Sequence, residues 1–211
     1  MIQGTVAIVN RGWIATPTVD WLWSLDRRAY HLATPIGGEV VRGRNRGVSD
    51  VKGGWVLFVD SDCVPGADAI DRLLAADLPI VGGVILERTG ELDVCVTKTF
   101  EPTVRYGLAE LPSTGVLPVL ALGTGCVLIR RYVLDRVPTP WFRAGQLVSD
   151  AITEDTEFCL RAAECGFPTY LDLSVRVGHV VRPLLWPHED GEFWVQWEGN
   201  PYREAMEIAV L

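Results

Sequence analysis

Two aspartates separated by one residue, Asp60 and Asp62, directly follow the apolar run at residues 55–59. This run of Val, Leu and aromatic residues lies between Gly and Pro residues, which predicts a buried strand. In an open α/β sheet, ligands bind where such strands leave the sheet. Two carboxylates held close together repel each other unless a cation lies between them, and their oxygens suit Mg²⁺ or Mn²⁺. Asp60 and Asp62 are therefore candidate metal ligands, and a polar turn in which Asp62 caps the next helix is the alternative.

A second acidic pair, Glu154 and Asp155, begins an expected helix over residues 154–164. Acids in a first helical turn are stabilised by the helix dipole and by unpaired backbone amides, so the pair has a purely structural explanation. If one of the two faces a cleft, it can instead take a proton from a hydroxyl nucleophile as a general base. Both interpretations stay open at this point.

Three further groups have the chemistry of a binding site. His179 is a lone imidazole on an apolar strand, either a hydrogen-bonded core histidine or a third metal ligand. The Arg-rich segment at residues 42–47 is either a solvated basic helix or a source of planar guanidinium groups for anionic oxygens. Gly123 and Gly125 form either a simple turn or a place where a ligand approaches the backbone closely.

The elements that must position these residues alternate between strands and helices, which predicts an α/β fold with a mainly parallel sheet covered by helices. Thr16 is the expected N-cap of the first helix, with Pro17 at the first helical position and apolar spacing that continues toward Tyr30. Gly166 and Pro168 are a stop signal for the last helix. The expected strands are 5–9, 55–59, 79–85, 125–129, 169–173 and 175–180, the other helices are 67–76 and 154–164, and 93–122 alternates like a β-ribbon.

Composition limits the classes of protein. A chain of 211 residues with 48% hydrophobic content can bury one sizeable core. No apolar run approaches ~18 residues and no signal peptide is evident, so we expect a soluble, cytoplasmic protein with no membrane partner. The five cysteines are scattered without a C-x-x-C pair, which indicates reduced thiols in the core. The net charge of −8 argues against a general nucleic-acid coat, although a local basic site remains compatible with it.

The order of the motifs, more than any one of them, resembles that of GT-A glycosyltransferases over about residues 5–182. The resemblance implies a GT-A type, Rossmann-like three-layer sandwich with a mainly parallel central sheet and a small antiparallel β-ribbon. It places the catalytic domain at residues 1–182, and residues 183–211 form a Trp-rich tail that packs on this domain or covers it as a lid. The motifs are Asn10-Arg11, Arg44-Asn45, residues 57–62, residues 123–126, residues 140–142, Glu154-Asp155 with Phe158, and Gly178-His179.

The resemblance also implies the chemistry. It points to a metal-dependent transfer of a hexose from a nucleotide-diphospho-sugar, with a UDP-sugar favoured, to a hydroxyl acceptor. Mn²⁺ or Mg²⁺ is expected on Asp60, Asp62 and His179, where it neutralises charge on the leaving diphosphate. Asp155 is the first candidate for the base of an inverting reaction, and Glu154 is the second.

Further residues are implied to contact the donor or to shape its pocket. Guanidinium groups are expected near the phosphates, polar residues at the end of the first strand near the nucleoside, and glycines and an aromatic ring around the sugar and acceptor. The acidic residue that usually contacts the base after a second strand is not identifiable in this sequence. The expected phosphate contacts are Arg42 and Arg44, the nucleoside contacts are Asn10 and Arg11, and Gly123, Gly125 and Trp141 shape the sugar and acceptor pocket. Asn45 and Ser61 are further expected contacts of the donor.

The acceptor and the rival functions stay open. The short chain resembles small bacteriophage glycosyltransferases, some of which modify hydroxymethylated pyrimidines in DNA, so DNA and saccharide acceptors are both considered. A metal-dependent nuclease could use the same acidic cluster with two cations. A nucleotidyltransferase could share the α/β layout, but no Gly-rich phosphate loop with a lysine lies near the N-terminus. A non-catalytic sugar-binding protein is the last alternative, and the presence of the metal acids argues against it.

Overall fold

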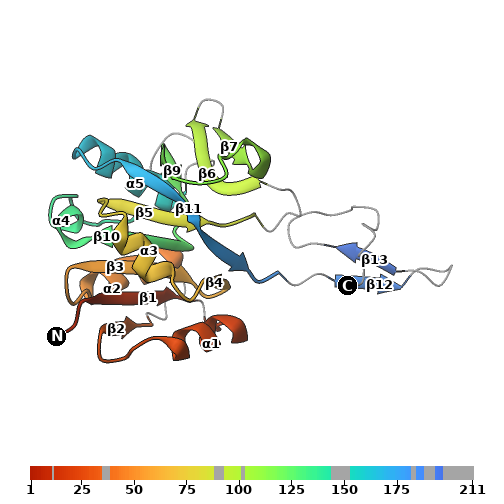
Figure 1. The fold of residues 1–211 in the computed structure, drawn as a ribbon, viewed down its shortest axis with the longest axis horizontal. Helices are drawn as coiled ribbons and strands as arrows, with labels where there is room; N and C mark the ends of the chain where they lie inside the picture. Colours follow the sequence, from red (N-terminus) through yellow and green to blue (C-terminus); the bar gives the residue numbers. More distant parts are fainter. Residues whose placement is uncertain are drawn as a thin grey trace.

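The centre of the protein, as described by a computed structural model, is an eight-stranded mixed sheet with helices on both faces (Figure 1). The structure describes residues 1–10, 12–34, 39–87, 93–100, 103–143 and 153–181, together with the backbone of 184–187 and 193–196. The strands of this sheet are β1 (Gly4–Val9), β2 (Tyr30–Ala33), β3 (Trp55–Asp60), β4 (Cys63–Pro65), β5 (Ile80–Val84), β8 (Val116–Val119), β10 (Cys126–Arg130) and β11 (Thr169–His179).

The strands of this sheet follow the order β2-β1-β3-β10-β5-β11-β4, and β8 pairs with β11. β1 is parallel to β2 and β3, and β5 is parallel to β11. β10 lies antiparallel between β3 and β5, so these two strands point the same way. The predicted mainly parallel sheet is therefore confirmed, with β10, β4 and β8 running in the opposite direction.

The helices form two layers around the sheet, because alternate residues of each strand point to opposite faces. Val56 and Phe58 of β3 belong to one core with Phe158, while Leu57 and Val59 belong to a second core with the other helices. This three-layer arrangement confirms the predicted fold class. The first face is covered by α2 (Val40–Ser49), α4 (Arg131–Leu134) and α5 (Glu154–Glu164), and the second by α1 (Thr16–Ser24) and α3 (Ala69–Ala75).

The predicted β-ribbon is a three-stranded antiparallel sheet of order β7-β6-β9. It is joined to the main sheet through Cys95, whose N–H donates to the carbonyl of Ile85 (2.9 Å) and whose carbonyl accepts from the N–H of Gly123 (2.8 Å). This places the ribbon beside the end of β5 (Figure 1). Its strands are β6 (Asp93–Phe100), β7 (Thr103–Gly107) and β9 (Ala121–Leu122), and a short 3-10 helix, η1 (Leu108–Glu110), follows β7.

The first helix differs from the prediction at both ends. Its N-cap is Ala15 rather than Thr16, and the helix ends at Ser24. The carbonyl of Asp26 then accepts the N–H of Tyr30 (3.2 Å), which forms a turn, and Tyr30 begins the unpredicted strand β2. The Tyr30 ring contacts Trp55 with centroids 5.6 Å apart. Packing on Trp55 therefore overrides the helical spacing that extended toward Tyr30.

The end of the described chain also departs from expectation. Residues 169–180 were predicted as two strands, but β11 is one strand whose register shifts between Asp172 and Arg176. The side chain of Asp172 accepts the N–H of Ser174 (2.9 Å), which stabilises this irregularity. In the tail, where little periodicity was evident, β12 (Leu184–Pro187) and β13 (Phe193–Gln196) form a separate two-stranded antiparallel sheet. Packing of the tail on residues 1–182 stays a prediction. Over the residues that the structure describes, no helix is both long and apolar enough to span a membrane.

Candidate functional site

The end of β3 meets the start of β10 at the carboxyl edge of the parallel strands. Asp60 is the last residue of β3, and Val59 pairs with Cys126 in the antiparallel register. The N–H of Asp60 donates to the carbonyl of Gly125 (3.1 Å). Because β10 runs antiparallel to β3, the turn before β10 lies beside Asp60, the aspartate that ends β3. This explains why motifs far apart in the sequence come together.

A second pairing brings the histidine to the same edge. The short strand β4 pairs antiparallel with the end of β11, so that His179 lies opposite Cys63. The N–H of Val180 donates to the carbonyl of Asp62 (2.8 Å). As a result, Nε2 of His179 lies 3.7 Å from Oδ2 of Asp62, and both side chains are largely buried.

These edges enclose a cavity of about 340 Å³, which is within the usual range for small-molecule sites. Its walls come from the ends of β3, β4, β10 and β11, the beginning of α5, α2 and the ribbon. The structure thus brings most of the sequence-predicted site residues into one space. Those that line the cavity are Arg44, Asp60, Asp62, Gly123, Gly125, Glu154, Asp155 and His179.

Arg44 joins the two acidic pairs. It extends from α2 with 3% of its surface exposed, and its Nη2 and Nε lie 3.1 Å from Oδ1 of Asp60 and Oε1 of Glu154, respectively. Burial alone lowers the pKa of this guanidinium, but the nearby carboxylates, Asp60 first, outweigh burial and raise the pKa. Its third nitrogen, Nη1, is buried and has no hydrogen-bond partner in the described part of the chain. Arg44 therefore holds Asp60 and Glu154 in place and leaves one donor unused.

Asp155 differs from its neighbour Glu154. Its Oδ1 accepts the N–H of Thr156 (2.8 Å) and the hydroxyl of Thr153, so the carboxylate is held at the start of α5. Its Oδ2 lies 3.6 Å from the position that a Cβ would occupy on Gly123. Because Gly123 has no side chain, this oxygen borders open space in the cavity, whereas an oxygen of Glu154 is bound to Arg44.

His179 is oriented by the backbone. Its Nδ1 lies 2.8 Å from the carbonyl oxygen of Leu86, which can only accept, so Nδ1 carries the proton. In the neutral imidazole, Nε2 then presents its lone pair to the carboxylate of Asp62. A backbone carbonyl behind Nδ1 is the arrangement that fixes histidine ligands in metal sites. Candidate ligand atoms of Asp62, Cys63 and His179 all lie within 4.8 Å of one another.

The cavity has the charge and the space for a cation. Its described lining has five carboxylates against two guanidinium groups, those of Arg44 and Arg105, so an added positive charge is favourable. A Cβ on Gly125 would lie 2.8 Å from Cδ1 of Ile85, 3.0 Å from Sγ of Cys63 and 3.6 Å from Oδ2 of Asp60, so the absence of a side chain lets the thiol and the carboxylate lie close to the same point of the backbone. Oxygen and imidazole donors suit Mn²⁺. The residues present therefore fit a divalent cation. The five acids are Asp60, Asp62, Glu87, Glu154 and Asp155.

Three predicted contacts lie in a different place. Arg42, Asn45 and Trp141 line a second, shallower groove on the outer side of α2. The amide of Asn45 donates to the carbonyl of Phe142 (2.8 Å) and accepts its N–H (3.2 Å). The indole of Trp141 donates to the carbonyl of Leu134 (2.9 Å). The structure therefore does not bring these three side chains into the cavity.

The predicted donor contacts Asn10 and Ser61 also lie outside the cavity lining. Asn10 is 5% exposed, and its side-chain oxygen accepts the N–H of Gly12 (3.0 Å). The carbonyl of Ser61 accepts the N–H of Ala15 (2.8 Å). Arg11 lies outside the described residues.

Several residues that line the cavity were not predicted. Thr124 lies within the glycine motif, and its Oγ1 is buried without a hydrogen-bond partner among the described residues. Cys63 directly follows Asp62, but it was interpreted as a core residue. All five cysteines are free, and Cys95 is half-buried and packs against the second core. Cys165 is exposed, so the expectation of a core position was wrong for this residue. The ribbon adds Cys95, Thr97 and Arg105, and the chain just after β5 adds Glu87.

The fold of this chain is similar to that of two proteins of known structure. A197 from STIV superposes with a TM-score of 0.62 at 19% identity, over 97% of this chain and 99% of that chain. GalNAc-T7, solved with UDP, GalNAc and Mn²⁺, superposes with a TM-score of 0.57 at 15% identity, over 84% of this chain and 44% of that chain. The fold is GT-A-like. No protein-family model and no curated protein matches the chain in sequence, and at these identities the structural likeness shows the fold alone.

Proposed function

We propose that this chain is a metal-dependent glycosyltransferase that moves a hexose from a nucleotide-diphospho-sugar, with UDP as the favoured nucleotide, to a hydroxyl acceptor. The observation that supports this most is the meeting of Asp60, Asp62, Asp155 and His179 on one cavity. That cavity lies where ligands bind in open α/β sheets. The neighbour GalNAc-T7 was solved with UDP and Mn²⁺, which supports the choice of donor and ion.

We assign the cation to Asp60, Asp62 and His179. When bound there, Mn²⁺ or Mg²⁺ would neutralise negative charge on the donor diphosphate as the nucleotide leaves. Arg44 keeps the Asp60 carboxylate turned to the cavity through its Nη2 contact. We assign to Arg44 a fixed positive charge near the donor phosphates, because the residue lines the cavity although its Nη1 is buried.

We assign the general base to Asp155. Its Oδ1 is held by two hydrogen bonds, and its Oδ2 borders the space beside Gly123. That oxygen would take the proton of the acceptor hydroxyl while the sugar is transferred with inversion. Glu154 is the weaker candidate, because its ion pair with Arg44 occupies one carboxylate oxygen and restricts the movement of the side chain.

The acceptor is a hydroxyl of a saccharide or of a hydroxymethylated pyrimidine in DNA. The net charge of −8 favours the saccharide, since binding to DNA draws on positive charge. Gly123, Gly125 and Thr124 form the wall nearest to the proposed base, and the open space there is where we place the reacting sugar.

The test combines a donor screen with a matched pair of variants. Hydrolysis of UDP-, GDP- and other nucleotide sugars is measured with Mn²⁺, and UDP binding is measured by calorimetry with and without Mn²⁺. We expect turnover with one class of donor and UDP binding that depends on the ion. Asp155→Asn should lower turnover by roughly 10²- to 10⁴-fold, the usual contribution of a general base, while binding of UDP and Mn²⁺ is kept.

Asp135→Asn is the matched control, because Asp135 is an exposed acid whose ion pair is with Arg131. This variant should behave as the native protein does. UDP binding of equal strength with and without Mn²⁺ would contradict the proposed cation role, and full turnover by Asp155→Asn would move the base to another residue.

A further inference from the structure

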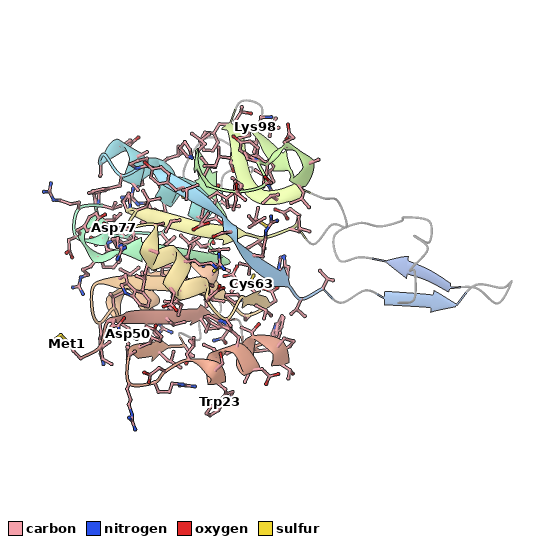
Figure 2. The ribbon with its side chains drawn as sticks, viewed as in Figure 1. Met1, Trp23, Asp50, Cys63, Asp77 and Lys98 are labelled. Carbon is pink, nitrogen blue, oxygen red and sulfur yellow. The ribbon has the colours of Figure 1, made fainter. Side chains whose placement is uncertain are left out.

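Cys63 is next to the proposed cation in both sequence and space, yet the proposed reaction gives it no role. It begins β4, immediately after Asp62, and it lies opposite His179 in the pairing with β11. Figure 2 labels Cys63 where β4 and the end of β11 come together. Only 1% of its surface is exposed, although the residue lines the cavity.

The thiol is placed as a ligand atom would be. Its Sγ belongs to the group with Asp62 and His179 in which all ligand atoms lie within 4.8 Å of one another. Two atoms bound to one ion at about 2.0–2.3 Å each are at most roughly 4.6 Å apart, so this spacing is close to that of a shared ion. The same Sγ and Oδ2 of Asp60 both lie near Gly125, at 3.0 Å and 3.6 Å from the position that a Cβ would occupy there.

We propose that Cys63 is a direct ligand of the cation and that the site therefore prefers borderline and thiophilic ions such as Zn²⁺ and Co²⁺, with Mn²⁺ weaker and Mg²⁺ weakest. Carboxylate, imidazole and thiolate together form an O, N and S donor set, and sulfur ligands select against hard ions. The ion replaces the thiol proton, which passes to the solvent. This inference rests on the proposed function, because the same ion serves the donor.

The alternative is a cysteine that only fills space. Cys126 illustrates that role, because it is fully buried in the second core and lies outside the ligand group. Cys63 shares that core, but its Sγ also lies within 4.8 Å of ligand atoms of Asp62 and His179. Within the described part of the chain, Asp62, Cys63 and His179 form the one such group of potential ligands.

The test uses Co²⁺ as a spectroscopic probe in the absence of any donor. A Co²⁺–thiolate bond adds a sulfur-to-metal charge-transfer band in the near ultraviolet, while the visible bands of Co²⁺ report on binding itself. We expect the native protein to show both the ultraviolet charge-transfer band and the visible Co²⁺ bands. Cys63→Ser should lose the ultraviolet band, keep visible bands and bind Zn²⁺ about tenfold or more weakly, since even outer-shell changes cost 10- to 100-fold. Cys95→Ser, which alters another thiol of the cavity, should change neither the ultraviolet band nor the affinity for Zn²⁺.

X-ray absorption on the unaltered protein loaded with Zn²⁺ provides a second measurement if the variant does not fold. A sulfur scatterer at about 2.3 Å supports the proposal, and a shell of N and O atoms alone at about 2.0–2.1 Å overturns it. Visible Co²⁺ bands without the ultraviolet band would also overturn it while leaving the cation site intact. No Co²⁺ binding at all would overturn both this proposal and the proposed metal-dependent function.

Discussion

The cavity and the outer groove lie on opposite sides of one helix, α2, and use arginine in different ways. Arg44 faces inward and is 3% exposed, with two carboxylates as partners. Arg42 and Arg46 face outward and line the groove with Trp141. The inward residue has lost its hydration and is fixed by ion pairs, whereas the side chains of Arg42 and Arg46 are exposed. The comparison teaches that burial, rather than the number of arginines, determines which positive charge belongs to the site.

The largest expected difference between the cavity and the groove is in how much the loss of an arginine lowers the free energy of unfolding. Arg44→Gln leaves the carboxylates of Asp60 and Glu154 without their cation, and loss of one partner of a buried pair costs about 3–5 kcal/mol. Because the Asp60 side chain is 35% exposed, we expect a loss near the lower end, about 3 kcal/mol. Urea denaturation of the native protein and the variant measures it. The matched control Arg42→Gln should change the free energy of unfolding by less than about 0.5 kcal/mol, and equal losses would remove the distinction between the two sides.

A smaller effect is expected at the floor of the groove. Asn45→Ala removes both hydrogen bonds to the backbone of Phe142, whose ring stacks on Phe158 with centroids 4.7 Å apart. Unsatisfied polar groups cost about 1–3 kcal/mol, and water entering the open groove should keep the loss near 1–2 kcal/mol. Chemical denaturation gives the loss, and calorimetry should show unchanged Mn²⁺-dependent UDP binding. Weaker UDP binding would instead show that Asn45 acts on the donor after all.

The smallest effect is expected from the exposed charges. The UDP affinity of the double variant Arg42→Gln with Arg46→Gln should stay within about twofold of the native value, because both side chains line the groove and not the cavity. A drop of tenfold or more would mean that the donor reaches across α2 to the groove.

Much of the fold and part of the site followed from local patterns. The apolar run before Asp60 predicted β3 and therefore the sheet edge at which Asp60 lies, and Gly166 marked the end of α5 correctly. Arg44 was predicted as a phosphate contact, but α2 has too few apolar residues for its periodicity to tell which arginine faces inward. The pairing of His179 with Cys63 depends on a three-residue strand, β4, which is too short to produce a pattern. The ribbon residues around the cavity depend on long-range packing, which no local spacing encodes.

The pairing of β4 with the end of β11 has a consequence for the order of folding. Asp62 lies near the end of the first third of the chain, and His179 lies at the end of the last strand of the main sheet. Contacts between such distant residues form late, because the entropy of closing the intervening loop must be overcome first. The first strands of the sheet can assemble without them. Asp62 and His179 therefore come together only when β11 pairs with β4. During synthesis, Asp60 and Asp62 are present in the chain well before the complete site can form.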